Sequence, residues 1–307
     1  MAEARRVRLS NEVRDALQRG APVVALESTI VTHGLPRPRN LELAQRLESV
    51  VREEGGIPAT TGVVGGDLVV GLSPNELERL AFGEADKASH WNIGAIVAKG
   101  GDAGTTVATT LLAAHLAGIS VFATGGIGGV HDAPFDESAD LPALSHYSVL
   151  TVCAGPKSIL DADATVERLE TLGVALVGYR SDNLAGFLVE QTGIKLPSRV
   201  DTPKEAAAVL AANRDLGLSQ GVLLSNPVSQ GLSKSDFDAL LARANEKAHQ
   251  AGVKGREATP FMLASLAELS EGRTVDVNLR LVEENTRLAT AVATAIAAMG
   301  GSARRRS

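Results

Sequence analysis

The chain has 307 residues, of which 44% are hydrophobic and only 3% aromatic, and its formal net charge at pH 7 is −6. This apolar content is enough for a buried core and excludes a disordered chain. No apolar run approaches the roughly 20 residues that cross a bilayer, and the N-terminus lacks the apolar region of a signal peptide. The acidic balance disfavours nucleic-acid binding. The lone Cys153 excludes an intramolecular disulfide, so we expect a cytoplasmic protein. From the charge and the absence of a long apolar run we expect no nucleic-acid or membrane partners.

Short apolar runs alternate with helical periodicity along most of the chain, which favours a largely parallel sheet covered by helices. We predict a three-layer α/β/α fold with a largely parallel or mixed central sheet, in one domain over 1–307 with flexible ends near 1–8 and 301–307. The predicted strands lie at 23–27, in a hairpin within 57–72, and at 95–99, 120–124, 149–154, 175–177 and 221–224. The predicted helices lie at 10–20, 40–54, from 73 onward, and at 105–117, 157–172, 203–213, 235–251, 259–271 and 278–299.

Two helix starts carry local signals. Ser10 can cap the first helix, and Ser73 is followed by Pro74 and, three residues after the serine, by Glu76. A serine cap, a proline at the first helical position and a glutamate at the third favour a helix that begins there.

Several common catalytic and cofactor motifs are missing from the sequence. It contains no Walker phosphate loop, no G-x-S-x-G nucleophile elbow and no H-E-x-x-H pair. The glycines at 125–129 do not complete G-x-G-x-x-G, because His131 stands where the third glycine would be. Any chemistry must therefore use other residues.

Polar residues directly after predicted strands are the main candidates, because ligands of open α/β sheets bind beyond the carboxyl ends of the strands. Glu27 ends an apolar run. Partial desolvation would raise its pKa and suit it to proton donation near neutral pH. The alternative is a carboxylate that forms a salt bridge with Arg37 or Arg39.

Lys157 follows the predicted strand at 149–154 and opens the next predicted helix, where the helix dipole disfavours a cation. A buried lysine there is a potential Schiff-base nucleophile. The alternative is a solvated lysine near a helix start. Cys153, inside an apolar strand, is expected to be a core residue.

Four carboxylates crowd one loop: Asp132, Asp136, Glu137 and Asp140. Such a cluster is typical of a hard divalent cation such as Mn²⁺ or Mg²⁺, and equally of helix capping by solvated side chains. Thr105, Thr106 and the glycines at 125–129 could bind a phosphate at a helix start. The same glycines are also common in tight turns without a ligand.

Together these segments resemble the pseudouridine-5′-phosphate glycosidase family, also called indigoidine synthase A-like. The resemblance runs in unbroken order over about residues 10–300, and its most specific parts are Glu27-Ser28-Thr29, Ser138-Ala139-Asp140 and the Cys-Ala-Gly-x-Lys motif that ends at Lys157. The matching blocks span 25–36, 105–110, 122–131, 136–141, 151–161 and 258–263.

The resemblance implies reversible cleavage of pseudouridine 5′-phosphate to uracil and ribose 5-phosphate, assisted by Mn²⁺, in a homotrimer. Lys157 would attack C1′ and open the ribose as an imine, Glu27 would donate a proton, and Asp136 would bind the metal. The substrate-binding positions would be Lys87, Val107, His131, Ser138, Ala139, Asp140 and Asn278.

The chemistry agrees with these roles, since a C–C glycosidic bond lacks the heteroatom that ordinary glycosidases protonate. An imine at C1′ supplies an electron sink, so an amine and a proton donor are needed.

The departures from the family are Pro156 before the lysine and a short loop between His131 and Asp136. Two other hypotheses remain: a Schiff-base aldolase acting on another phosphosugar, and a non-catalytic protein that binds a sugar phosphate or nucleotide.

Overall fold

The computed structural model of the chain describes residues 6–131, 136–253 and 258–304. Within them an 11-stranded sheet has the order β1-β4-β3-β2-β7-β8-β11-β9-β10, and β5 and β6 extend it beside β3. All pairings are parallel except β3 with β4 and β3 with β6, so the predicted largely parallel or mixed sheet is confirmed. The strands are β1 (Val7–Leu9), β2 (Val23–Leu26), β3 (Ile57–Val64), β4 (Asp67–Val70), β5 (Asp86–Ala88), β6 (Ala103–Thr105), β7 (Val121–Ala123), β8 (Leu150–Cys153), β9 (Ala175–Tyr179), β10 (Ser198–Val200) and β11 (Val222–Ser225).

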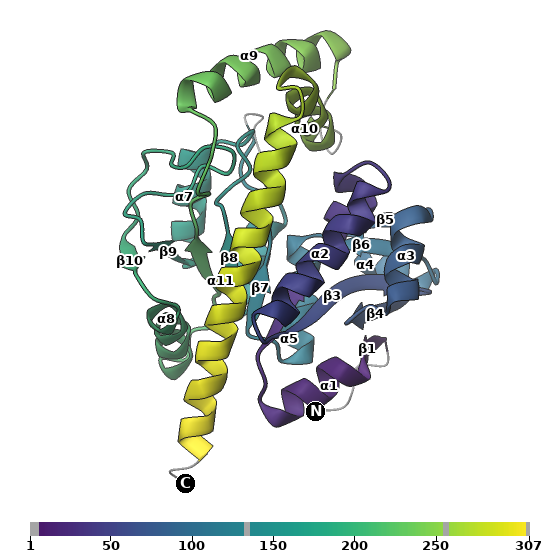
Figure 1. Cartoon of the computed structure of the whole chain (residues 1–307), viewed down its shortest axis with the longest axis vertical. Coiled ribbons are helices and arrows are strands. Elements are labelled where there is room, and N and C mark those ends of the chain that lie inside the picture. Colours follow the sequence, from purple (N-terminus) through teal and green to yellow (C-terminus); the bar gives the residue numbers. More distant parts are fainter. Residues whose placement is uncertain (1–5, 132–135, 254–257, 305–307) are drawn as a thin grey trace.

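Helices cover both faces of this sheet (Figure 1). None of those in the described ranges is long and apolar enough to cross a membrane. They are α1 (Asn11–Arg19), the π-helix η1 (Ile30–Gly34), α2 (Arg39–Glu53), α3 (Pro74–Phe82), α4 (Ile93–Ala98), α5 (Val107–Ala117), α6 (Asp140–His146), α7 (Ala162–Thr171), α8 (Pro203–Asp215), α9 (Lys234–Ala251), α10 (Ala258–Leu269) and α11 (Arg273–Arg304).

Alternating side chains of the central strands divide the core in two. Val24 and Leu26 of β2 pack with α2, α8 and α11 on one face, whereas Val23 and Ala25 pack with α1, α5 and α6 on the other. This is the period of two that a strand buried on both faces requires. The long α11 crosses the first face beside α2 (Figure 1). The three-layer prediction is confirmed.

Local sequence signals predicted two helix starts and one hairpin correctly. The Ser10 side chain accepts a hydrogen bond from the Val13 amide and caps α1. Ser73 and Glu76 form a complete capping box at α3. The predicted hairpin within 57–72 is the antiparallel pair β3–β4.

The strand predicted at 95–99 was wrong, because Ile93–Ala98 form helix α4. Four apolar residues in a row do not distinguish a strand from a helix, and here the turn at Ser89–Asn92 leads the chain into a helix. Of the ends that we expected to be flexible, the first overlaps β1, which starts at Val7, and the second overlaps the end of α11 at Arg304. Residues 1–5 and 305–307 lie outside the described ranges.

Candidate active site

The carboxyl ends of three adjacent parallel strands bring the main candidates together. β2 pairs with β7 and β7 with β8, so the residues that follow each strand meet at one edge of the sheet. Glu27 follows β2, Thr124 follows β7, and Lys157 comes four residues after the end of β8. This edge is where an open α/β sheet binds ligands.

Glu27 is a half-buried carboxyl among groups of both charges. The Thr124 hydroxyl donates a short hydrogen bond to its Oε1 atom. Burial raises the pKa of Glu27; the charge of Lys157 and the hydrogen bond from Thr124 lower it less, and the net direction is upward. Arg37 instead donates to the Gly83 carbonyl, 3.1 Å away, and among the described residues no salt bridge to Glu27 occurs. The salt-bridge alternative for Glu27 was therefore wrong.

Lys87 and Lys157 place two amines beside this carboxyl. Lys87 lies on β5 and keeps contact with solvent, yet the surrounding protein lowers its pKa, and the charge of Lys157 lowers it further. The charges of Asp140 and Glu27 raise that pKa, so all four side chains are within electrostatic reach of one another.

Lys157 does not open a helix, as the sequence pattern had predicted. It lies in the turn before α7, and its amide donates to the Ile127 carbonyl at 3.0 Å. Asp161 caps α7 by accepting a hydrogen bond from the Ala164 amide at 2.9 Å. Helix α7 starts later than residue 157 because the Asp161 side chain caps the free amide groups of its first turn. The turn still holds the half-buried Lys157 beside Glu27.

Asp140 organises the loops around the site. It is buried, and its carboxylate accepts hydrogen bonds from the Ala108 amide at 3.0 Å and the Gly128 amide at 2.8 Å. The Asp140 amide donates to the Ser138 hydroxyl oxygen at 3.2 Å, across Ala139. Asp140 therefore ties the start of α5, where Val107 lies, to the glycine-rich turn. Five predicted substrate positions thus lie close together. The hydrogen bonds of Asp140 join it to the segments that contain Val107, Ser138 and Ala139. Lys87 lies near enough for the charge of Asp140 to raise its pKa.

The glycine-rich turn is close-packed rather than open to a ligand. A Cβ on Gly126 would stand 2.7 Å from a carbon of the Phe187 ring, and one on Gly128 would stand 2.2 Å from the Ser138 hydroxyl. The amides of Ile127 and Val130 donate to the protein itself. These glycines are required by close approach, so the tight-turn interpretation is the one that the structure favours.

The two threonines proposed for phosphate binding are used inside the protein. Thr106 caps α5, and Thr105 is fully buried in a network of hydroxyl groups. Ser28, Thr61 and Thr110 complete that network, with Thr61 2.8 Å from Thr105. The network joins the end of β2 to β3, β6 and α5, and it fixes the backbone next to Glu27.

The described residues of the acidic loop do not form an all-protein metal cage. Glu137 pairs with Arg168 at 2.9 Å, Asp140 is satisfied by amides, and Asp132 lies outside the described residues. No cluster of three metal-ligating side chains occurs in the described ranges. Asp136 remains, with a half-buried side chain. Its main-chain carbonyl accepts a hydrogen bond from the His131 amide at 2.9 Å. This donor set fits a hard cation held by one carboxylate, water and a substrate phosphate.

Helix α11 closes the site from the other end of the sequence. The Asn278 Oδ1 atom lies 3.4 Å from where a Cβ on Gly125 would stand, so this side chain faces the glycine-rich turn. Sequence reasoning missed Asn285, which is fully buried and donates to the Thr124 carbonyl at 2.8 Å. A polar residue in an otherwise apolar helical stripe was the signal that could have found it.

A π-helix begins three residues after Glu27, and the sequence did not predict it either. η1 begins after Thr29, whose hydroxyl oxygen is buried and has no hydrogen-bond partner among the described residues. Single π-turns occur frequently at functional sites.

Cys153 is fully buried, and burial raises the pKa of its thiol to about 12. This confirms the core assignment, since the thiolate that reacts is not populated at neutral pH.

Comparison with known proteins places these features in context. The family model described as "Indigoidine synthase A like protein" matches residues 12–295. A protein of Thermus thermophilus named pseudouridine-5′-phosphate glycosidase is 56% identical over 91% of this chain and 99% of its own length. A protein of Sorangium cellulosum with the same name is 47% identical over 97% of this chain and 96% of its own length.

Two solved structures share the fold. One is the prealnumycin C-glycosynthase in complex with ribulose 5-phosphate, with a TM-score of 0.90, 35% identity, and coverage of 97% of this chain and 99% of that chain. The other is an indigoidine synthase A-like protein from Thermotoga maritima, with a TM-score of 0.87, 35% identity, and coverage of 95% and 96%.

Proposed function

Because the chain belongs to the indigoidine synthase A-like family, we propose that it is an enzyme that reversibly cleaves the C–C glycosidic bond of pseudouridine 5′-phosphate to uracil and ribose 5-phosphate. Relatives named for this activity match nearly the whole chain. A C-glycosynthase of the same fold, solved with a sugar phosphate, supports C–C chemistry on a phosphosugar. The observation that carries the proposal is the half-buried Glu27, with its raised pKa, in the electrostatic field of Lys157.

The reaction needs an amine nucleophile and an acid. The neutral Lys157 amine bonds to C1′ while the C1′–O4′ bond breaks, and a proton of the amine passes to O4′. Glu27 then protonates the uracil carbon, the C1′–C5 bond breaks, and the nitrogen lone pair forms the C1′ imine. Water hydrolyses the imine to ribose 5-phosphate and frees Lys157.

The other residues of the site would bind and orient the substrate. Lys87 supplies a charge for the phosphate or a ring oxygen, and the Val107 segment and Ser138-Ala139-Asp140 form the surrounding wall. His131 follows the glycine-rich turn in the chain, and Asn278 lies beside Gly125. A Mn²⁺ ion bound at Asp136 would neutralise phosphate charge and fix the position of the substrate.

The first test incubates the purified protein with pseudouridine 5′-phosphate, with Mn²⁺ or with EDTA, and quantifies uracil by chromatography. We expect metal-dependent release. Release in both samples would remove the metal from the proposal, and no release from a folded protein would favour the aldolase or the binding protein instead.

The second test addresses Lys157. Lys157→Ala should lose turnover, and borohydride should trap ribose 5-phosphate on the wild type but not on this variant. Lys195→Ala, which removes an exposed lysine between β9 and β10, is the matched control and should keep both properties. Normal turnover in Lys157→Ala would exclude the imine mechanism.

We also propose that the protein works as a homotrimer in the cytoplasm. The family resemblance supports the trimer, and the lone buried thiol agrees with a reducing compartment. Sedimentation velocity would test the first proposal and cell fractionation the second. A monomer, or protein found in an exported fraction, would contradict them.

A further inference from the structure

A cavity lies at the opposite edge of the sheet from Glu27. It has a volume of about 460 Å³ and lies at the amino ends of β7 and β8, beneath the C-terminal ends of α5 and α8. About four residues of β7 separate it from Thr124, or roughly 13 Å at 3.3 Å per residue. Its lining is His115, Gly118, Ile119, Ser120, Ser148, Arg214, Gly217, Leu218 and Ser219, with no acidic residue.

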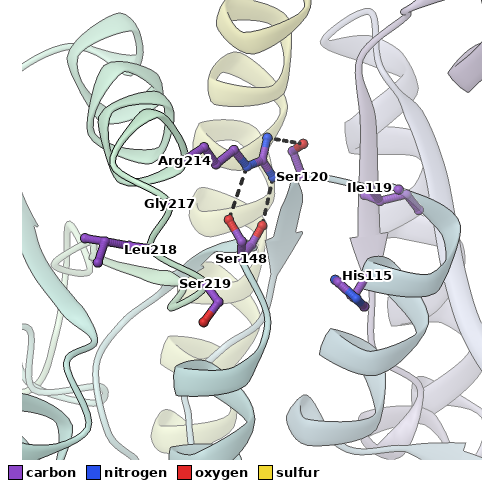
Figure 2. Close-up of a pocket in the computed structure, with 9 residues that line it drawn as sticks. His115, Ile119, Ser120, Ser148, Arg214, Gly217, Leu218 and Ser219 are labelled. Carbon is purple, nitrogen blue, oxygen red and sulfur yellow. Dashed lines mark hydrogen bonds between the residues drawn. The ribbon is translucent and has the colours of Figure 1, made fainter.

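One arginine dominates this cavity. The Arg214 guanidinium donates to the Ser148 hydroxyl at 3.1 Å, the Ser120 hydroxyl at 3.1 Å and the Ser148 carbonyl at 2.8 Å (Figure 2). It has five N–H groups, so two remain for a ligand. Among the described residues no carboxylate forms a salt bridge with it.

The serines beside Arg214 turn the same end of the cavity into a set of donors. Because the Ser120 and Ser148 oxygens accept from the guanidinium, their O–H groups are left to donate. Arg214 is exposed to solvent, and partial burial of its guanidinium lowers its pKa. It remains charged at neutral pH. An arginine with free N–H donors, beside two free hydroxyl donors and without a salt-bridge partner among the described residues, is suited to charge-assisted hydrogen bonds with an anion.

We propose that this cavity is a second ligand site, separate from the Glu27–Lys157 site, that binds the phosphate group of a small phosphorylated metabolite. Arg214 holds the phosphate oxygens together with Ser120 and Ser148. Leu218 adds an exposed apolar side chain to the lining, and the volume exceeds that of a free phosphate and suits a ligand of sugar-phosphate or nucleotide size. This inference does not depend on the proposed reaction.

The test counts binding sites by titration calorimetry, with ribose 5-phosphate as the probe. Wild-type protein should show a site that is weakened at least tenfold in Arg214→Gln. Ser219→Asp should weaken it equally, because a carboxylate on the lining repels phosphate while the arginine keeps its hydrogen bonds. Arg243→Gln, which removes the same charge from α9, should bind like the wild type.

Two further measurements complete the test. Circular dichroism must show that each variant is folded; if Arg214→Gln is not, Ser219→Asp decides alone. Ribose without phosphate should not bind, and inorganic phosphate should bind more weakly than its ester. Unchanged binding in Arg214→Gln and Ser219→Asp, or equal binding of ribose, would overturn the proposal. Uracil release, measured separately, reports only on the opposite edge of the sheet.

Discussion

At Glu27, several neighbours act on one carboxyl in opposing directions. Burial and the charge of Asp140 favour its neutral form, whereas Lys157, Thr124 and Lys87 favour the carboxylate. The raised pKa that results keeps a proton available closer to neutral pH, as a general acid requires. Thr124 is the neighbour that can be altered without removing a charge.

We predict that Thr124→Val moves the alkaline limb of the pH–rate profile to higher pH. Loss of this hydrogen bond raises the pKa of Glu27 further, so the acid stays protonated over a wider range. The measurement is kcat for uracil release against pH. Thr171→Val, on the far helix α7, is the control with the same isosteric change. A profile that stayed in place, or moved to lower pH, would show that Glu27 is not the acid.

The glycines show how far sequence reasoning reaches at this scale. Glu27, Asp140 and Lys157 were predictable because each follows a strand or lies in a specific motif. The role of Gly126 and Gly128 was not, because it depends on Phe187 and Ser138 approaching from other segments. A glycine in the sequence states only that space or backbone freedom is needed.

At the scale of elements, α11 anchors the turn that follows β7. Asn285 spans two loops: its amide nitrogen donates to the Thr124 carbonyl at 2.8 Å, and its Oδ1 accepts from Asn226 at 3.0 Å. Since Thr124 in turn contacts Glu27, a residue far along the chain positions the carboxyl that we propose as the proton donor.

We therefore predict that Asn285→Leu loses about 1–3 kcal/mol of unfolding free energy, because the buried Thr124 carbonyl and the half-buried Asn226 amide each lose a hydrogen bond. kcat should fall while Lys157 remains trappable by borohydride with ribose 5-phosphate. Urea unfolding and steady-state kinetics measure the two effects. Ala298→Leu, on the same helix beyond the site, is the control. Full activity in Asn285→Leu would show that the turn holds its position without the anchor.

The buried hydroxyl network makes a similar contribution on the other side of Glu27. Thr61→Val keeps the shape of the side chain but deprives Thr105 and the Leu26 carbonyl of a partner. We expect a loss of about 1–3 kcal/mol in urea unfolding. Thr171→Val, whose hydroxyl is at the surface, should change stability little. An unaltered midpoint in Thr61→Val would mean that water or rearrangement replaces these bonds.

Elements were predictable where their signals were local. The capping residues Ser10 and Ser73 depend only on the next three residues, and both predictions are confirmed. Strands β5 and β6 have three residues each. They form because β5 pairs with β6 and β6 pairs with β3, and three residues are too few for a hydrophobic periodicity to predict them. The strand predicted at 95–99 was wrong for a related reason, since a short apolar run shows neither the period of a strand nor that of a helix.

At the scale of the whole molecule, the two faces of the sheet have separate cores, and both edges carry polar sites. The alternation of apolar runs and helices was enough to predict three layers. The strand order was not predictable, because it depends on which distant segments pair; β8 lies next to β11 rather than β9. That order sets β2, β7 and β8 side by side and thereby creates both the active-site edge and the Arg214 cavity.

A half-buried acid with a raised pKa also affects the stability of the whole fold. The folded protein binds the Glu27 proton more tightly than the unfolded chain, whose carboxyl has the ordinary pKa of 4.5. As the pH rises above that value toward the raised folded pKa, the unfolded state loses its proton first, and folding becomes less favourable. The cost is about 1.4 kcal/mol for each unit by which the two pKa values differ.

Glu27→Gln removes this dependence because the amide does not ionise. We predict that its unfolding free energy, relative to the wild type, increases between about pH 5 and about pH 8, while uracil release falls at least about 100-fold. Urea unfolding at both pH values measures the first effect, and Glu78→Gln, an exposed site on α3, corrects for the general loss of one negative charge. A difference that does not change with pH would mean that Glu27 is as well solvated in the fold as in the unfolded chain, and it would then lack the environment of a proton donor. A difference that grows with pH together with lost turnover would indicate that the acid needed for C–C cleavage is held at the expense of stability, as is common at active sites.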